Sequence, residues 1–255
     1  MSTESPRERT GDAPTFRILH SNVQDSKMSE MPSIQTRPAA PVVARPATRT
    51  PRRDAAENRS AILEAAKAAL NRDIDASLTT IAEEANLSRR AIYGHFATRD
   101  DLVTEVLTRG AERVGASLDP ISHPDARIEI ALFGATLWSE VEHVRVMAQL
   151  AVRGPHRERV ARALAPARSR LQQAVERGAA AGQLRRDIEP DTLARLVEGA
   201  ALSVLDEATR TGMSRARGHQ LVMLCTLSAA GLSWHDADDI ITTTPALAFT
   251  GEVPA

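Results

Sequence analysis

The 255-residue sequence is poor in the residues on which several protein classes depend. It has one cysteine, Cys225, which excludes an internal disulfide and fits a reducing compartment. Aromatic residues make up only 3% of the chain, which disfavours a β-sheet core. No apolar run approaches the ~20 residues that a membrane helix needs, and the first residues lack a signal-peptide core. We therefore expect a soluble, cytoplasmic protein without a membrane partner.

Catalytic and cofactor signatures are also missing from the sequence. Gly-x-Ser-x-Gly, a phosphate-binding glycine loop and a dinucleotide fingerprint do not occur. The seven histidines are scattered. The one ligand-rich cluster, around His235, follows an expected helix end, where such side chains are usually solvated. We predict no enzymatic activity, no catalytic residues, no cofactor and no metal site.

What the chain does have is an abundance of helix-forming residues. Hydrophobic residues make up 42% of it, enough to bury a substantial core in one or two domains. Alanine, leucine, arginine and glutamate dominate, so the predicted fold class is all-α. The net charge is −1, so any affinity for nucleic acid must come from local placement of basic residues.

The stretch from Ser77 to Phe96 has the pattern of two short helices joined by a tight turn. We expect Thr80 and Glu83 to form a capping box at the start of the first helix. Asn86 tolerates the left-handed backbone that a sharp turn requires, and Ser88 is a favourable N-cap for the second helix. Apolar residues of the first helix recur at the spacing of one buried stripe: Leu78, Ile81, Ala82 and Ala85.

The outer face of the second helix is basic and aromatic. Between Arg49 and Leu118 there are eleven basic and eleven acidic residues, yet from Ala85 to Arg99 there are three arginines and no acid. Helix-turn-helix proteins place such a helix in the major groove of DNA. The alternative is an ordinary helical hairpin with a solvated basic face. The residues predicted to contact DNA from this helix are Ser88, Arg89, Arg90, Tyr93 and His95.

Residues 58–107 resemble the DNA-binding domain of the TetR family of transcriptional regulators. The matching pieces are AILEAA, TTIAEEA, the LS-R-x-x-IY-x-HF core and T-R-D-D-L. The resemblance implies phosphate contacts by Thr79, Thr80 and Arg99. It also implies a homodimer that binds a palindromic operator in double-stranded DNA, with repression relieved by a small effector. The chain departs from the family at Asn86, where glycine is commonest, and at Arg90, where a small residue or proline is usual.

Residues 1–53 hold seven of the fourteen prolines and no periodic apolar pattern, which predicts a disordered basic tail. Arg49, Arg52 and Arg53 precede the first helix directly, as in basic arms that enter the minor groove. The alternative is a solvated leader without a partner. The predicted organisation is the tail (1–53), a helix-turn-helix domain (54–117), a helical ligand-binding and dimerisation domain (122–241) and a flexible tail (242–255).

A first helix is predicted to begin at Asn58. A long helix is predicted from Asp125 to Val152, and we expect one side of it to line an effector cavity. The wall of that cavity would be mostly aliphatic, so we expect a small, largely hydrophobic effector. The alternative is that these side chains pack solidly and leave no cavity. The predicted ligand-binding residues are Phe133, Leu137, Trp138, Glu140, Val144 and Met147.

Two further helices, one opened by Pro190 and one spanning 218–234, are apolar around more of their circumference than one small domain covers. The resemblance implies a four-helix bundle of these helices from two subunits; the alternative is the core of a monomer. The predicted interface residues are Leu193, Leu196, Val197, Ala200, Ala201, Val204, Leu221, Leu224 and Leu227.

The function that we predict is a sequence-specific transcriptional regulator, most simply a repressor released by a hydrophobic effector. Two alternatives stay open. One is a ligand-independent regulator controlled by a protein partner, and the other is a helical enzyme or scaffold that carries an unused helix-turn-helix.

Overall fold

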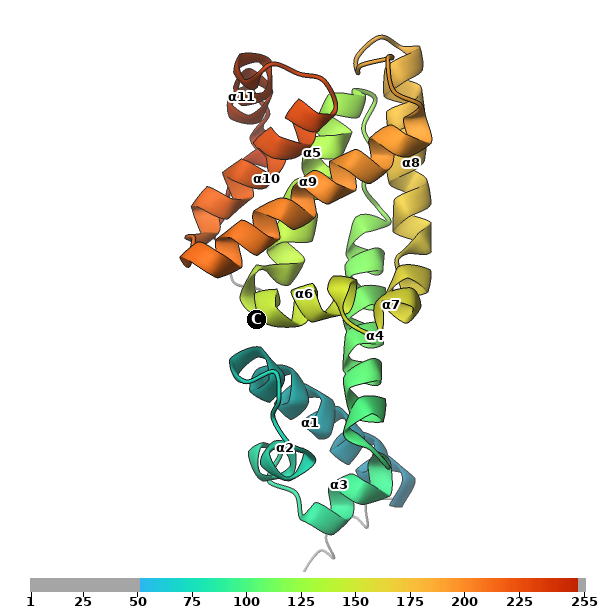
Figure 1. Cartoon of the computed structure of the whole chain (residues 1–255), viewed down its shortest axis with the longest axis vertical. Coiled ribbons are helices and arrows are strands. Elements are labelled where there is room, and N and C mark those ends of the chain that lie inside the picture. Colours follow the sequence, from blue (N-terminus) through green and yellow to red (C-terminus); the bar gives the residue numbers. More distant parts are fainter. Residues whose placement is uncertain (1–50, 252–255) are drawn as a thin grey trace, which may run out of the picture. The chain divides into compact units, whose positions relative to one another are not determined.

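The computed structural model describes residues 51–251, with side chains from Ala55 onward. Every regular element in that range is helical, so the predicted all-α class is confirmed (Figure 1). None of these helices is both long and apolar enough to cross a bilayer. The elements are α1 (Pro51–Arg72), α2 (Leu78–Glu84), α3 (Arg89–His95), α4 (Arg99–Leu118), α5 (Ala126–Val141), the 3-10 helix η1 (Glu142–Val144), α6 (Arg145–Arg153), α7 (Arg157–Ala163), α8 (Ala165–Ala180), α9 (Pro190–Thr211), α10 (Arg215–Ala229), α11 (Trp234–Thr243) and the 3-10 helix η2 (Pro245–Leu247).

Helices α1 to α4 enclose an apolar core that is shared with α6 and α7. Met147 of α6 and Val160 of α7 complete it from outside the helix-turn-helix segment. The prediction that α1 begins at Asn58 was wrong, because the helix begins at Pro51 and Asn58 lies in its interior. The fully buried large side chains of this core are Ile62, Leu70, Ile81, Ile92, Leu102 and Val103.

Helix α4 links this core to the rest of the chain. Thr98 caps it, because the Thr98 hydroxyl accepts from the Asp101 amide while the Asp101 carboxylate accepts from the Thr98 amide. The helix then packs against α5, α6, α7 and α8. Its later turns supply Val114 and Leu118 to a second, small apolar cluster.

The predicted long helix from Asp125 to Val152 is broken. Helix α5 ends at Val141, η1 follows, and Val144 leaves helical geometry (φ −130°, ψ 36°) before α6 begins. An ion pair accompanies the break, since the buried Glu142 carboxylate lies 2.5 Å from Nε of the half-buried Arg215 at the start of α10. The Arg145 guanidinium donates to the Ala208 carbonyl at 3.0 Å. These contacts stabilise a bend that the apolar spacing of the sequence does not reveal.

Helices α9 and α10 lie side by side (Figure 1). Helix α10 also packs against α5, and α9 also packs against α8. Helix α10 ends at Ala229, before the predicted 234, because Gly231 takes a left-handed φ of 106° and Ser233 caps α11. The segment from residue 242, which was expected to be flexible, is packed against the rest of the chain as far as Leu247. Its Leu247 is 1% exposed, and the Leu247 carbonyl oxygen lies 3.0 Å from His219 Nε2. Packing therefore fixes the chain at least to this point.

Candidate nucleic-acid interface and cavity

The turn between α2 and α3 has the backbone that the sequence predicts. Asn86 is the one non-glycine residue with positive φ (54°) among residues 51–251. The Ser88 hydroxyl accepts from the Ala91 amide and so caps α3. The capping box expected at Thr80 was wrong, because α2 starts earlier and Ser77 is its N-cap, accepting from the Thr80 amide at 3.1 Å.

The outer face of α3 is open to solvent. Arg89 and Arg90 are exposed, Tyr93 is 46% exposed, and His95 is half-buried. The Arg89 guanidinium carbon lies 5.6 Å from the centre of the Tyr93 ring. Gly94 has no atom within 4 Å of the place where a Cβ would be, so the backbone itself is accessible there. This face presents guanidinium donors, a phenol and bare backbone together.

The opposite face of α3 is anchored in the core. Ile92 is 0% and Phe96 2% exposed. The Arg59 guanidinium of α1 lies 4.4 Å from the Phe96 ring centre and donates to the His95 carbonyl at 3.1 Å. The C-terminal end of the short helix is thereby fixed, which matters because a helix of seven residues has little stability of its own.

The residues predicted to contact phosphates have different surroundings. Thr79 is half-buried, and the exposed Thr80 shares a 2.9 Å hydrogen bond with the Ser77 hydroxyl. Arg99 donates to the Ala76 carbonyl at 2.9 Å and also to the Ile74 carbonyl, so its guanidinium supports the loop before α2. Of the basic-arm residues, Arg49 lies outside the described residues. Arg52 and Arg53 fall in the first turns of α1, where side chains are not described.

The negative charge of Glu84, at the end of α2, is compensated by an arginine. Arg72, at the end of α1, forms an ion pair with Glu84, at the end of α2. The hydrogen bonds from Arg72 lower the pKa of the Glu84 carboxyl, and those same bonds raise the pKa of Arg72. Glu84 is therefore charged but compensated near neutral pH, and it repels a polyanion less than a free carboxylate would.

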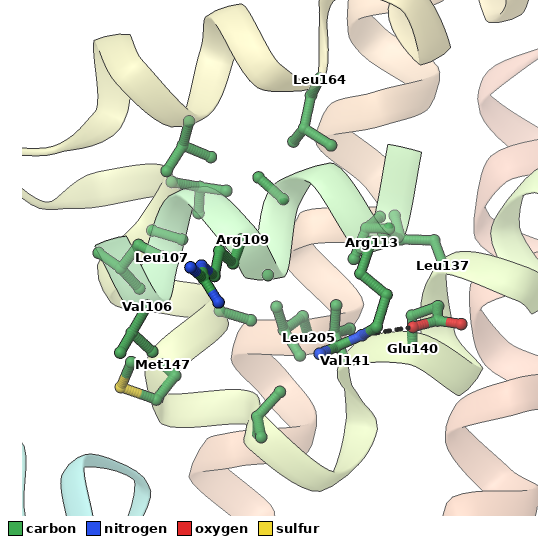
Figure 2. Close-up of a pocket in the computed structure, with 18 of the residues that line it drawn as sticks. Val106, Leu107, Arg109, Arg113, Leu137, Glu140, Val141, Met147, Leu164 and Leu205 are labelled. Atoms are coloured by element: carbon green, nitrogen blue, oxygen red, sulfur yellow. Dashed lines mark hydrogen bonds and ion pairs between the residues drawn. The ribbon is translucent and has the colours of Figure 1, made fainter. Parts of the chain in front are cut away.

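A cavity of about 220 Å³ lies among α1, α4, α5, α6, α7, α9 and α10 (Figure 2). Aliphatic side chains from several of these helices form most of its wall. They include Leu63, Val106, Leu107, Leu137, Val141, Met147, Leu164, Leu202 and Leu205.

Five of the six predicted ligand-binding residues line this cavity: Leu137, Trp138, Glu140, Val144 and Met147. Phe133 does not line it. It is 6% exposed and packs with Val114, Leu118 and Ala167 in the separate apolar cluster.

Sequence reasoning missed the contribution of α1 and α4 to the cavity. Ser60, Leu63, Glu64 and Lys67 of α1 and Arg109 and Arg113 of α4 all line it. No local signal marks these residues, because Leu63 also fits the core of the helix-turn-helix domain and the other five fit a solvated helix face. The packing of α6 against α1, α4 and α9 brings them to a common space.

The outer faces of α9 and α10 are accessible, but the helices bury part of the predicted dimer interface within the chain itself. Leu193, Val197, Ala201, Val204 and Leu227 belong to the chain's own core and do not lie on the accessible outer face. Leu196 is 49% exposed, and Ala200, Leu221 and Leu224 are half-buried. The exposed Gly199 and Ser203 extend this outer face.

The described residues contain no group of three or more His, Cys, Asp or Glu side chains placed to hold a metal ion. The acidic residues near His235 lie on α11, where the Asp236 amide donates to the Ser233 hydroxyl in the helix cap.

Residues 62–106 match a family profile described as bacterial regulatory proteins, tetR family. No curated protein sequence matches the chain significantly. Among solved structures, SmeT, the repressor of the Stenotrophomonas maltophilia multidrug efflux pump SmeDEF, is 23% identical, with a TM-score of 0.54 over 77% of this chain and 96% of that one. FadR from Bacillus subtilis, in complex with stearoyl-CoA, is 14% identical, with a TM-score of 0.58 over 68% and 99%. RolR in complex with resorcinol is 18% identical, with a TM-score of 0.52 over 79% and 97%.

These TM-scores show a shared fold, and the profile match covers the core of the helix-turn-helix domain. In that domain α3 is capped, anchored and open on its basic face. The chain therefore carries a helix-turn-helix segment that matches the tetR family of bacterial regulatory proteins over residues 62–106, within a fold that it shares with these solved structures.

Proposed function

We propose that the chain is a ligand-responsive repressor that binds a palindromic operator as a homodimer. The observation that carries this proposal is the composition of the cavity wall. Four residues of α1 and several of α4, both of which pack in the helix-turn-helix core, line the same space as residues of α5, α6 and α9. A molecule in that space touches the DNA-binding domain directly.

Known relatives support a small-molecule effector. RolR is described with resorcinol and FadR with stearoyl-CoA, while SmeT is described as a repressor. The wall of the present cavity is mainly aliphatic, so a largely hydrophobic effector fits it.

The proposed switch acts through α1 and α4. Helix α1 packs against α2 and α4, and α2 packs against α3, so a shift of α1 moves the helix that faces DNA. Asn71, in the last turn of α1, donates a 3.0 Å hydrogen bond to the His143 carbonyl of η1 and ties α1 to the break between α5 and α6. A ligand releases DNA only to the extent that it binds the DNA-free arrangement more tightly.

The DNA contact is tested by selecting bound sequences from a random pool with the full chain, followed by binding titrations at several salt concentrations. We expect enriched palindromes whose half-site centres lie about 34–36 Å, or a multiple of that, apart. Arg89→Ala is expected to cost ~1–3 kcal/mol and to relax the preference at one base position. Tyr93→Ala is expected to abolish specific binding, with the helical circular-dichroism spectrum unchanged.

Arg157→Ala is the matched control, because Arg157 is exposed on α7, outside the helix-turn-helix segment. It should bind like the wild type. Unchanged affinity of both α3 variants would refute the assignment of α3 to the DNA groove, and a pool without enriched sequences would refute specific operator binding.

A further inference from the structure

The charged side chains that line the cavity differ in how fully they are paired. Glu140 accepts from the Ser117 hydroxyl at 2.7 Å and from Arg113 Nε at 3.3 Å, one bond on each carboxylate oxygen. Figure 2 shows Arg113 extending from α4 to Glu140 along the cavity. This acid therefore has its own cation and its own hydroxyl donor.

The two other acids of the lining are paired as well. Arg168 of α8 donates to both oxygens of Glu198, at 2.9 and 3.0 Å from Nε. Lys67 Nζ lies 2.7 Å from a Glu64 carboxylate oxygen. A cationic ligand would have to displace a guanidinium or an ammonium group from each acid that it approached.

Arg109 is the exception among the charged residues of the lining. Within residues 51–251 its one partner is Glu105, whose Oε1 lies 2.8 Å from Arg109 Nη2. Both oxygens of Glu105 already accept from Arg59, one of them at 3.2 Å from Nε. Two guanidinium groups thus share one carboxylate, which leaves a surplus positive charge and spare N–H donors on Arg109.

Arg109 lies where a charged ligand group can stay hydrated. Its side chain is 53% exposed, and it lines the cavity together with Val106 and Leu107 of the same helix. An anion held here keeps contact with water, whereas an anion among Leu137, Val141 and Leu205 would lose its hydration without compensation.

The size of the cavity limits the apolar part of a ligand. A cavity of roughly 150 Å³ lined by Leu, Ile and Phe holds benzene. A cavity of about 220 Å³ therefore accepts one ring with a short substituent.

We propose that the cavity binds a compact amphipathic anion, with a carboxylate on Arg109 and an apolar body about the size of one substituted ring among the aliphatic side chains. A guanidinium group matches a carboxylate through two parallel N–H···O bonds, which gives the orientation as well as the charge preference. This inference rests on the proposed ligand-responsive function and specifies the chemical class of the effector.

The test compares 4-ethylbenzoate with its neutral analogue 4-ethylbenzamide at pH 7. Trp138, which lines the cavity and is 2% exposed, serves as the reporter in a Trp234→Phe background, because Trp234 is the other tryptophan and is 65% exposed on α11. We expect the carboxylate to bind about tenfold more tightly than the amide, a difference of ~1.4 kcal/mol. Arg109→Gln should weaken carboxylate binding about tenfold and leave amide binding within about twofold.

Arg157→Gln is the control, since it removes an exposed arginine that does not line the cavity. It should retain the preference for the carboxylate. Equal binding of the two probes, a preference for the amide, failure of both to bind, or an unchanged preference in Arg109→Gln would each overturn the proposal.

Release of the selected operator is measured in the same titrations, so that the two proposals fail separately. If the carboxylate binds through Arg109 but DNA affinity does not change, the charge preference stands and the ligand-responsive function is wrong. If the amide binds equally and releases DNA, the function stands and the inference about Arg109 is wrong.

Discussion

At the scale of single residues, close packing around Trp138 holds α5, α6 and α10 together. The indole Nε1 donates to the Arg215 carbonyl at 3.0 Å, and the Arg145 guanidinium lies 5.1 Å from the ring. Gly218 of α10 faces the same indole, where a Cβ would come within 1.9 Å of Cζ2. Glycine is required at this position for space, although it is unfavourable in a helix interior.

We expect Gly218→Ala to lower the free energy of unfolding by ~1–3 kcal/mol, because the clash with the indole outweighs the gain in helix propensity. Gly110→Ala is the matched control in the interior of α4, where nothing lies within 4 Å of the added carbon. That variant should be more stable by ~0.5–1 kcal/mol. Urea unfolding followed by circular dichroism measures both, and equal shifts would show that Gly218 is not needed for space.

At the scale of elements, the break between α5 and α6 decides where the cavity lies. Met147 and Ala148 of α6 line it, and α6 packs against both α1 and α9. A continuous helix through η1 would carry these side chains in another direction. The element that the apolar pattern concealed is therefore the one that connects the DNA-binding domain to the cavity.

Ala148→Phe would place a benzyl-sized group in the cavity. We expect it to abolish the Trp138 fluorescence response to 4-ethylbenzoate, because the added ring occupies the space that the probe would fill. Ala180→Phe, at an exposed position on α8, adds the same ring outside the cavity and should respond normally. A normal response of the Ala148 variant would mean that the probe binds elsewhere.

At the scale of the whole molecule, the accessible outer face of α9 and α10 is the surface that we propose for dimerisation. It combines Leu196 with small residues such as Gly199 and Ala200, which allow two helices to approach closely. A two-fold axis through this face would bring the same surface of both subunits into contact, as in an isologous dimer.

Leu196→Arg should therefore yield monomers in light scattering and lose operator binding, while its helical circular-dichroism spectrum stays like that of the wild type. Leu196 is a suitable target because 49% of it is exposed, so the change leaves the chain's own core intact. Gln173→Arg, at an exposed position on α8, is the control and should remain dimeric. A wild type that is monomeric at micromolar concentration would contradict the proposed assembly.

The sequence by itself determined the features that depend on neighbours in the chain. Asn86 in the turn, the caps at Ser88 and Thr98, and the burial of Ile81 and Ile92 follow from local backbone preference and from apolar spacing, which act within a few residues. The tertiary structure alone decided the break at Glu142, whose ion-pair partner Arg215 is 73 residues away, and the burial of Leu193 and Val197 within the chain. It also brought α1 and α4 to the cavity and separated Phe133 from it. The reason is physical: a helical pattern shows which side chains are apolar, but which helix covers each of them depends on contacts between distant segments.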